Sequence, residues 1–168
     1  MERCEGCGFA WDLISATDVP ERLRSAAAAY RTAFAEPTAT LTIRREPTTW
    51  SALQYGGHVR DVLFNLRDRI VLGLAEDNPV PHRLFPDLRV DLGLYERDDA
   101  STLAAEITVA TNLLIRTIAA LSPEQLDRPI FYAWPVEATR TLLWVAAQAL
   151  HETEHHLADI EALIARAA

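Results

Sequence analysis

The stretch that decides the fold is TRTLLWVAAQALHETEHHLADIEALIARAA, residues 139–168. Within it Leu143, Leu150, Leu157 and Ile164 recur at seven-residue intervals, which gives a helix one apolar seam for packing. The pattern predicts a single helix from about Thr139 to the end of the sequence, roughly 28 residues or ~42 Å at 1.5 Å per residue.

A second long helix has the clearest start signal. Ser51 can cap it while Gln54 reaches back from the third position, and Trp50 and Tyr55 have the spacing of a hydrophobic staple. The apolar pattern continues through Leu66 and Ile70, and we expect the helix to end before Asn78-Pro79. Gly56-Gly57 inside it would lower its stability by about 1 kcal/mol per glycine, so we expect a close approach of another backbone there.

Two further helices are expected, one from Asp18 to before Pro37 and one from about residues 98–101 through Ile118. Ser122 opens a short helical turn, residues 129–135 read as a loop, and residues 41–43 could form a short strand. Residues 37–48 and 78–98 are proline-containing connections. Four long helices without a convincing strand pattern predict a four-helix bundle.

Composition narrows the class of protein. The chain has 168 residues, 49% hydrophobic and 24% charged, which suits one globular domain. Its net charge of -8 disfavours nucleic acid as a partner. All basic residues are arginine, which excludes a Schiff-base or P-loop lysine. No signal pattern opens the sequence and no apolar run reaches the roughly 20 residues of a membrane span, so we expect a cytoplasmic protein with no membrane partner.

Two histidines of the last helix have the spacing of metal ligands. His151 and His155 lie one turn apart at the edge of the buried arc, so their imidazoles can converge on one ion. On the same helical wheel His156 falls on the other side, and Glu152 and Asp159 point toward water. Two ligands do not complete a site, and a third donor is needed.

His151-Glu152-Thr153-Glu154-His155 also fits the H-E-x-x-H pattern of zinc peptidases, with Glu152 as general base. That class needs its third ligand downstream. The extended signature would place glycine at position 158 and histidine at 161, where this chain has Ala158 and Glu161. The pattern therefore argues against a peptidase.

Trp50-Ser51 followed after six residues by His58, together with His151-Glu152-x-x-His155-His156 on the last helix, resembles the DinB-like metalloprotein family. The resemblance implies an all-α fold, an up-down-down-up type four-helix bundle with long connecting loops, over residues 18–168. It implies a divalent metal, most simply zinc or nickel, held by His58, His151 and His155. Residues 1–17 form an N-terminal extension with the Cys4-x-x-Cys7 pair.

Three imidazoles leave the charge of a divalent ion uncompensated, so an open coordination position would favour an anion. A thiol bound there would lose its proton. Related bundles are thought to activate mycothiol or bacillithiol, and the resemblance implies a thiol-dependent transferase or isomerase acting on a small molecule, with mycothiol as co-substrate. A metal-dependent hydrolase of small molecules and a non-catalytic metal- or ligand-binding bundle are the alternatives. A homodimer is an open possibility for the assembly.

Other site residues are less clearly marked. Asp61 and Asn65 share the face of His58, and Glu154 points toward the buried arc, so these three are catalytic candidates. Arg60 and Arg67 are candidates for binding a carboxylate of a cofactor or substrate.

Cys4 and Cys7 have the spacing of a redox pair or of half a metal site, and two thiolates alone cannot close a zinc site. We expect the bundle to fold without this segment, so that removing residues 1–12 would change stability little.

Overall fold

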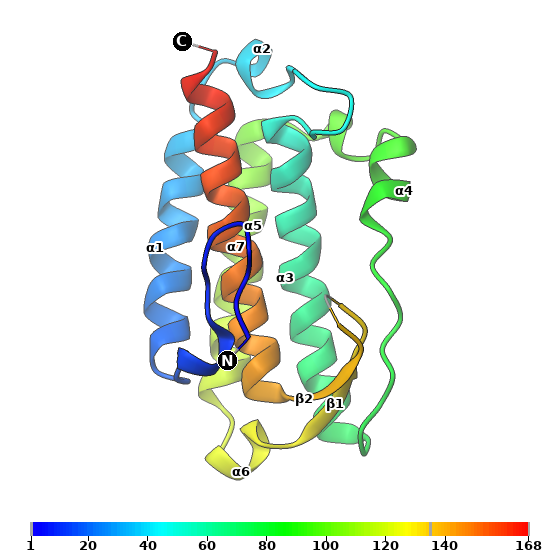
Figure 1. Cartoon of the computed structure of the whole chain (residues 1–168). Coiled ribbons are helices and arrows are strands. Elements are labelled where there is room, and N and C mark those ends of the chain that lie inside the picture. The colour runs from blue at the N-terminus through cyan, green and yellow to red at the C-terminus, as the bar shows by residue number, and fades with distance from the viewer. Residues whose placement is uncertain (1, 135, 168) are drawn as a thin grey trace.

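Four long helices run side by side in the computed structural model (Figure 1). The chain ascends in the first, descends in the second and third, and ascends in the fourth, which is the predicted up-down-down-up order. These helices are α1 (Asp18–Ala33), α3 (Ala52–Ala75), α5 (Ala100–Ala119) and α7 (Leu142–Ala165). The structure describes residues 2–134 and 136–167; Met1, Pro135 and Ala168, in the predicted extension, loop and last helix, lie outside that description.

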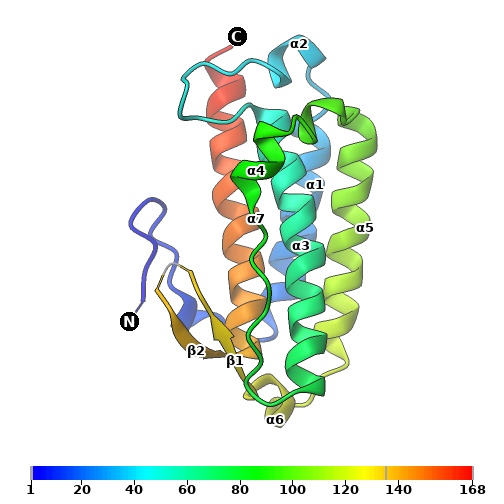
Figure 2. The same cartoon turned by 90° about the vertical axis from the view of Figure 1, so that its right-hand side faces the viewer.

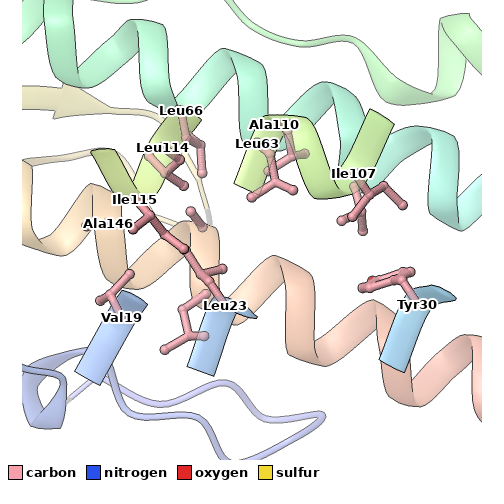
Figure 3. Close-up of a cluster of buried hydrophobic side chains, with 14 of the residues drawn as sticks. Val19, Leu23, Tyr30, Leu63, Leu66, Ile107, Ala110, Leu114, Ile115 and Ala146 are labelled. Carbon is pink, nitrogen blue, oxygen red and sulfur yellow. The ribbon is translucent and has the colours of Figure 1, made fainter. Parts of the chain in front are cut away.

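Each helix packs against two others, so that α1 and α3 both contact α5 and α7. Apolar side chains from all four meet in the middle of the bundle (Figure 3). Leu23, Leu63 and Leu114 are completely buried there. The apolar faces predicted from the sequence therefore meet in the core. This packing holds α3 and α7, the two helices that carry the histidines, in a fixed position relative to each other.

The start of α3 is the one that the sequence predicts. The Ser51 hydroxyl accepts a hydrogen bond from the Gln54 backbone N–H at 3.2 Å, and the Gln54 side chain accepts one from the Ser51 N–H at 2.9 Å. The rings of Trp50 and Tyr55 lie 5.3 Å apart, centroid to centroid. This capping box and staple fix the first turn of α3, one turn before His58.

Gly56 and Gly57 let aromatic side chains approach α3, where the sequence predicts a backbone. A Cβ atom at Gly56 would lie 2.3 Å from the Phe34 ring, and one at Gly57 would lie 2.5 Å from the Tyr95 ring. Tyr95 belongs to the short helix η2 (Tyr95–Arg97), at the end of the long connection between α3 and α5. Gly57 therefore allows that connection to pack closely against α3, and Gly56 does the same for the end of α1.

Two predicted connections differ from expectation. Residues 41–43 form no strand, because Thr38–Leu41 is a helical turn, α2, that buries Leu41. The predicted loop at 129–135 begins instead with strand β1 (Pro129–Tyr132), which pairs antiparallel with β2 (Ala138–Thr141). The last helix therefore starts at Leu142, capped by Thr141, and not near Thr139. Short helices α4 (Pro86–Asp91) and α6 (Pro123–Leu126) complete the connections, and the chain between α3 and α4 climbs back along the bundle (Figure 2).

The N-terminal segment is part of the packed structure. Its short helix η1 (Trp11–Leu13) places Trp11 in the hydrophobic core, 3% exposed. The Trp11 indole N–H donates to the Gln148 Oε1 atom on α7 at 2.7 Å. The expectation that residues 1–12 contribute little to stability conflicts with this burial.

Helix α5 is the one candidate for a membrane span among the described residues, by its length and its mean hydropathy of 1.2. Leu103, Ile107 and Leu114 of this helix are completely buried in the bundle. Its apolar character is therefore already used in the core.

Candidate metal centre

A cleft of about 760 Å³ lies between α3, α7, the chain around residues 83–88 and the turn of the β1–β2 hairpin. All four histidines of the two helices, His58, His151, His155 and His156, line it. The volume is that of a small-molecule site.

At the floor of the cleft His58 of α3 meets two residues of α7. The Nε2 atoms of His58 and of His156 each lie 3.3 Å from the same carboxylate oxygen of Glu152, Oε2. The three side chains are only 9%, 16% and 12% exposed, and their donor atoms all lie within 4.8 Å of one another. Two imidazoles and a carboxylate form a ligand set used by catalytic zinc sites.

The two donor side chains from α7, Glu152 and His156, are held by other residues. His156 Nδ1 lies 2.9 Å from Asp159 Oδ2, so an N–H on Nδ1 donates to that carboxylate and leaves Nε2 free to bind. The other Glu152 oxygen, Oε1, accepts from the Gln148 side-chain amide at 2.7 Å. The Tyr55 ring stacks on His156 with centroids 5.0 Å apart, and the Trp50 ring meets His58 edge-to-face with centroids 5.3 Å apart. Such fixed orientation is typical of metal ligands.

The same contacts set the ionisation of the metal-free group. Burial opposes the charge of His156, but hydrogen bonds to Asp159 and Glu152 outweigh it and raise the pKa of His156 to about 9. Burial alone would raise the pKa of Glu152, but hydrogen bonds from His156 and His58 outweigh it and lower that pKa well below its usual range. Without metal, Glu152 is therefore a carboxylate paired with an imidazolium.

His151 and His155 belong to a second group of donors, with Cys4 and Cys7. These four donor atoms also lie within 4.8 Å of one another, and the Cys4 Sγ atom is 3.9 Å from His155 Nδ1. His151 is 2% exposed, and burial lowers its pKa to about 4. Both of its ring nitrogens are buried without a hydrogen-bond partner.

Among the described residues, none of the donor groups within this distance unites His58 with both His151 and His155. The predicted triad stays a prediction that experiment must test. The helical wheel was wrong in placing Glu152 toward water and His156 away from the interior. It assumed one buried arc, whereas α7 packs against both α1 and α3 and is covered by the N-terminal segment.

Most of the other predicted site residues contact one another or neighbouring helices outside the cleft. Asp61 accepts from Arg60, Arg89 and the Tyr95 hydroxyl, and Arg60 also pairs with Asp98 and Glu106. These contacts connect α3 to the long connection and to α5.

Glu154 forms a bidentate ion pair with Arg22 of α1. Arg67 pairs with its neighbour Asp68. Five candidate residues were predicted besides the histidine triad. Asn65 lines the cleft, and the other four do not belong to its lining.

The cleft also contains residues that the sequence did not mark. Arg69 lies with its guanidinium 4.8 Å from the Tyr132 ring centroid, its Nε atom buried without a partner. Arg83 and the half-exposed Trp134 are further lining residues. Nothing local distinguishes them from solvated residues, because Arg83 and Trp134 reach the cleft through the long connection and the hairpin, and Arg69 lies three turns beyond His58 on α3.

The family model of the DinB superfamily matches residues 17–160. The chain belongs to this superfamily, and the resemblance noted in the sequence is confirmed. No curated protein matches the chain.

Several solved structures share the fold. YfiT from Bacillus subtilis, described as a probable metal-dependent hydrolase with an unusual four-helix bundle topology, is 20% identical with a TM-score of 0.83, over 91% of this chain and 89% of YfiT. A mycothiol-dependent maleylpyruvate isomerase is 14% identical with a TM-score of 0.68, and the match covers 90% of this chain but 62% of the isomerase. The DinB-like protein YjoA from Bacillus subtilis is 16% identical with a TM-score of 0.62, over 89% and 90%.

Proposed function

We propose that this protein binds one divalent metal ion at the floor of the cleft through His58, Glu152 and His156, and that it is a thiol-dependent transferase or isomerase for a small molecule. The observation that carries the proposal is the convergence of His58 Nε2 and His156 Nε2 on one oxygen of Glu152, 3.3 Å from each, inside a cleft that a small molecule can enter.

The residues present fit a metal. Asp159 orients His156 and Gln148 orients Glu152. The Nδ1 atom of His58 is buried without a hydrogen-bond partner, and the His58 ring is positioned by its packing against Trp50. Two neutral imidazoles and one carboxylate leave an ion such as zinc or nickel with a net positive charge. When bound, it would lower the pKa of a thiol or water at its remaining position.

The rest of the cleft suits a small anionic molecule. Apart from the proposed metal ligands, the lining holds two positive charges, Arg69 and Arg83, and one negative charge, Asp87, while Trp134 and Tyr132 supply flat apolar surface. Asn65, on the same face of α3 as His58, can donate to or accept from a bound polar group. An acidic thiol such as mycothiol or bacillithiol, or an organic acid that reacts with it, fits this combination.

Which residues bind the metal also decides whether the alternative function, hydrolysis of a small molecule, is chemically possible. A hydrolase needs a base next to the metal-bound water. Glu152 would be free for that role if His58, His151 and His155 held the ion, but is occupied if Glu152 is itself a ligand. The structural similarity to YfiT, which is described as a probable metal-dependent hydrolase, is the reason to include the hydrolase alternative in the experiments below.

Metal analysis of ligand variants tests the proposal. The experiment uses a Cys4→Ser, Cys7→Ser background, purified without a nickel column, so that only histidine and carboxylate donors remain. We expect about one ion per chain in this background, and its loss in His58→Ala and Glu152→Ala. Glu154→Ala is the matched control, because that carboxylate lies two residues away and pairs with Arg22.

His151→Ala in the same background separates the two ligand sets. Retention of the ion supports Glu152 and His156 as ligands, whereas its loss, with the ion retained in Glu152→Ala, would support the predicted histidine triad and overturn this one.

Calorimetry with mycothiol tests the chemistry. If the ion accepts a thiolate, binding should release a proton, because a free thiol has a pKa near ~8.5. Titrations in buffers of different ionisation enthalpy measure that release, which should vanish in His58→Ala. Equally tight binding with and without metal would instead indicate a non-catalytic ligand-binding bundle, and turnover of small esters or amides without added thiol would indicate a hydrolase.

A further inference from the structure

We propose that Cys4, Cys7, His151 and His155 form a second metal site, a closed four-coordinate zinc site that fastens the N-terminal segment to α7. The assignment is independent of the metal proposed for the cleft floor, since the two sites share no ligand.

The N-terminal segment forms a tight turn that presents both thiols to α7. The Cys4 N–H donates to the Phe9 carbonyl and the Gly8 N–H donates to the Cys4 carbonyl, each at 2.8 Å. Gly8 has a φ of +75°, which glycine adopts without strain. At Gly6 a Cβ atom would lie 3.2 Å from the His155 ring, so this turn sits directly on the helix.

His151 supplies the observation that most needs an explanation. It is 2% exposed, yet neither ring nitrogen has a hydrogen-bond partner. Its ring packs against both Trp11 and Phe9, with centroids 4.7 and 5.2 Å away. Buried polar groups in proteins nearly always have partners, so an imidazole with two unpaired nitrogens points to a missing ligand.

The donor set fits zinc in number, spacing and charge. A C-x-x-C pair and an H-x-x-x-H pair are the ligand spacings of Cys₂His₂ zinc sites. Tetrahedral bonds of 2.0–2.3 Å place ligand atoms ~3.3–3.8 Å apart, and the four donors here already lie within 4.8 Å of one another. Two thiolates balance the two charges of the ion, which suits a partly buried position.

The competing chemistry of the same residues is a Cys4–Cys7 disulfide. In the structure both are free cysteines. A disulfide would leave both ring nitrogens of His151 without a hydrogen bond, with Glu152 Oε1 3.9 Å from Nδ1, whereas the zinc site gives one of these nitrogens a partner and uses both thiols.

Cobalt substitution tests the site without any assay of activity. We expect the Co²⁺-loaded full-length protein to show thiolate-to-cobalt charge-transfer absorption and the intense visible bands of tetrahedral cobalt. The charge-transfer band should disappear in Cys4→Ser, Cys7→Ser and weaken in His155→Gln. His82→Gln is the matched control, because His82 lies exposed in the long connection and in none of the described donor groups.

Zinc counting separates this site from the one in the cleft. Wild-type protein should hold about two zinc ions per chain, and the double cysteine variant and His58→Ala about one each, by loss of different ions. Wild-type zinc content in the double cysteine variant, or no thiolate band with cobalt, would overturn the second site. So would a mass 2 Da below that of the reduced chain in protein that holds no cysteine-bound metal, since it would identify a disulfide.

Discussion

Replacing Trp11 with alanine should destabilise the protein strongly, although the residue precedes the four-helix bundle. Its indole is 3% exposed and stacks on Trp144 with ring centroids 5.8 Å apart and planes 15° from parallel. Its N–H also satisfies the buried Gln148 side chain at 2.7 Å. Tryptophan-to-alanine changes in a core lower the free energy of unfolding by about 3–5 kcal/mol, because transfer free energy is lost and a cavity remains.

Urea denaturation followed by far-ultraviolet circular dichroism measures this loss without using tryptophan fluorescence as the signal. For a chain of this length each kcal/mol corresponds to about 2–4 °C, so the melting temperature should fall by about 6–20 °C. Trp134→Ala is the matched control, since Trp134 is 52% exposed in the hairpin turn, and should stay within about 0.5 kcal/mol of the wild type. A loss below about 1 kcal/mol in Trp11→Ala would refute the argument that the N-terminal segment completes the core.

Trp11→Phe separates the loss of stability caused by lost packing from the loss caused by the missing hydrogen bond. Phenylalanine keeps most of the apolar contact but cannot donate to Gln148, which then has a buried oxygen without a partner. That change should destabilise by about 1–3 kcal/mol, less than alanine does. Equal losses in the two variants would mean that the hydrogen bond, and not the packing, dominates.

Three further predictions follow from single contacts. Gly57→Ala should destabilise by about 1–3 kcal/mol in urea titrations, despite about 1 kcal/mol of gained helix propensity, because its Cβ would lie 2.5 Å from the Tyr95 ring; stability equal to wild type would contradict this packing. In the Cys4→Ser, Cys7→Ser background, Asp159→Asn should weaken metal binding by about 10–100-fold in competition with a chelating dye, since it removes the carboxylate partner of His156, while exposed Asp68→Asn should not; this background is used because the same Asp159 oxygen lies 3.7 Å from His155 Nε2. In metal-free protein the pKa of His156 is raised to about 9, so its contribution to stability should be complete below pH ~6.5 and be lost as pH rises through 9; unfolding free energies across that range should show a fall that His156→Gln lacks.

The parts of the fold that the sequence predicts well are those decided within a few residues. The Ser51–Gln54 capping box and the Trp50–Tyr55 staple act over one helical turn, and both have the expected geometry. The seven-residue seam of α7 predicts burial only in part: Leu150 is completely buried, whereas Leu143, Leu157 and Ile164 are half-buried, and Ile160 and Leu163 fill the core instead. Local hydrogen bonds and one periodic face thus suffice to predict four helices and their approximate ends.

The parts that were missed depend on residues far apart in the chain. Residues 129–132 become a strand only because residues 138–141 pair with them, and the intervening loop has no common hairpin signal. Glu152 is buried because His58, far away in the sequence, lies against it. A helical wheel with one apolar seam cannot represent a helix that contacts α1, α3 and the N-terminal segment at the same time.

The six residues 151–156, HETEHH, contain two pairs of potential metal ligands at i, i+4 spacing: His151 with His155, and Glu152 with His156. Successive residues of a helix are rotated by about 100°, so the pairs form two neighbouring stripes along α7. One stripe faces His58 on α3, and the other faces the turn that carries Cys4 and Cys7. Spacing alone makes both stripes equally able to bind metal. What each stripe binds depends on the further donors that complete its site. Those donors come from the segment that packs opposite the stripe. The complete ligand set therefore follows from the tertiary structure, although the HETEHH motif itself is local.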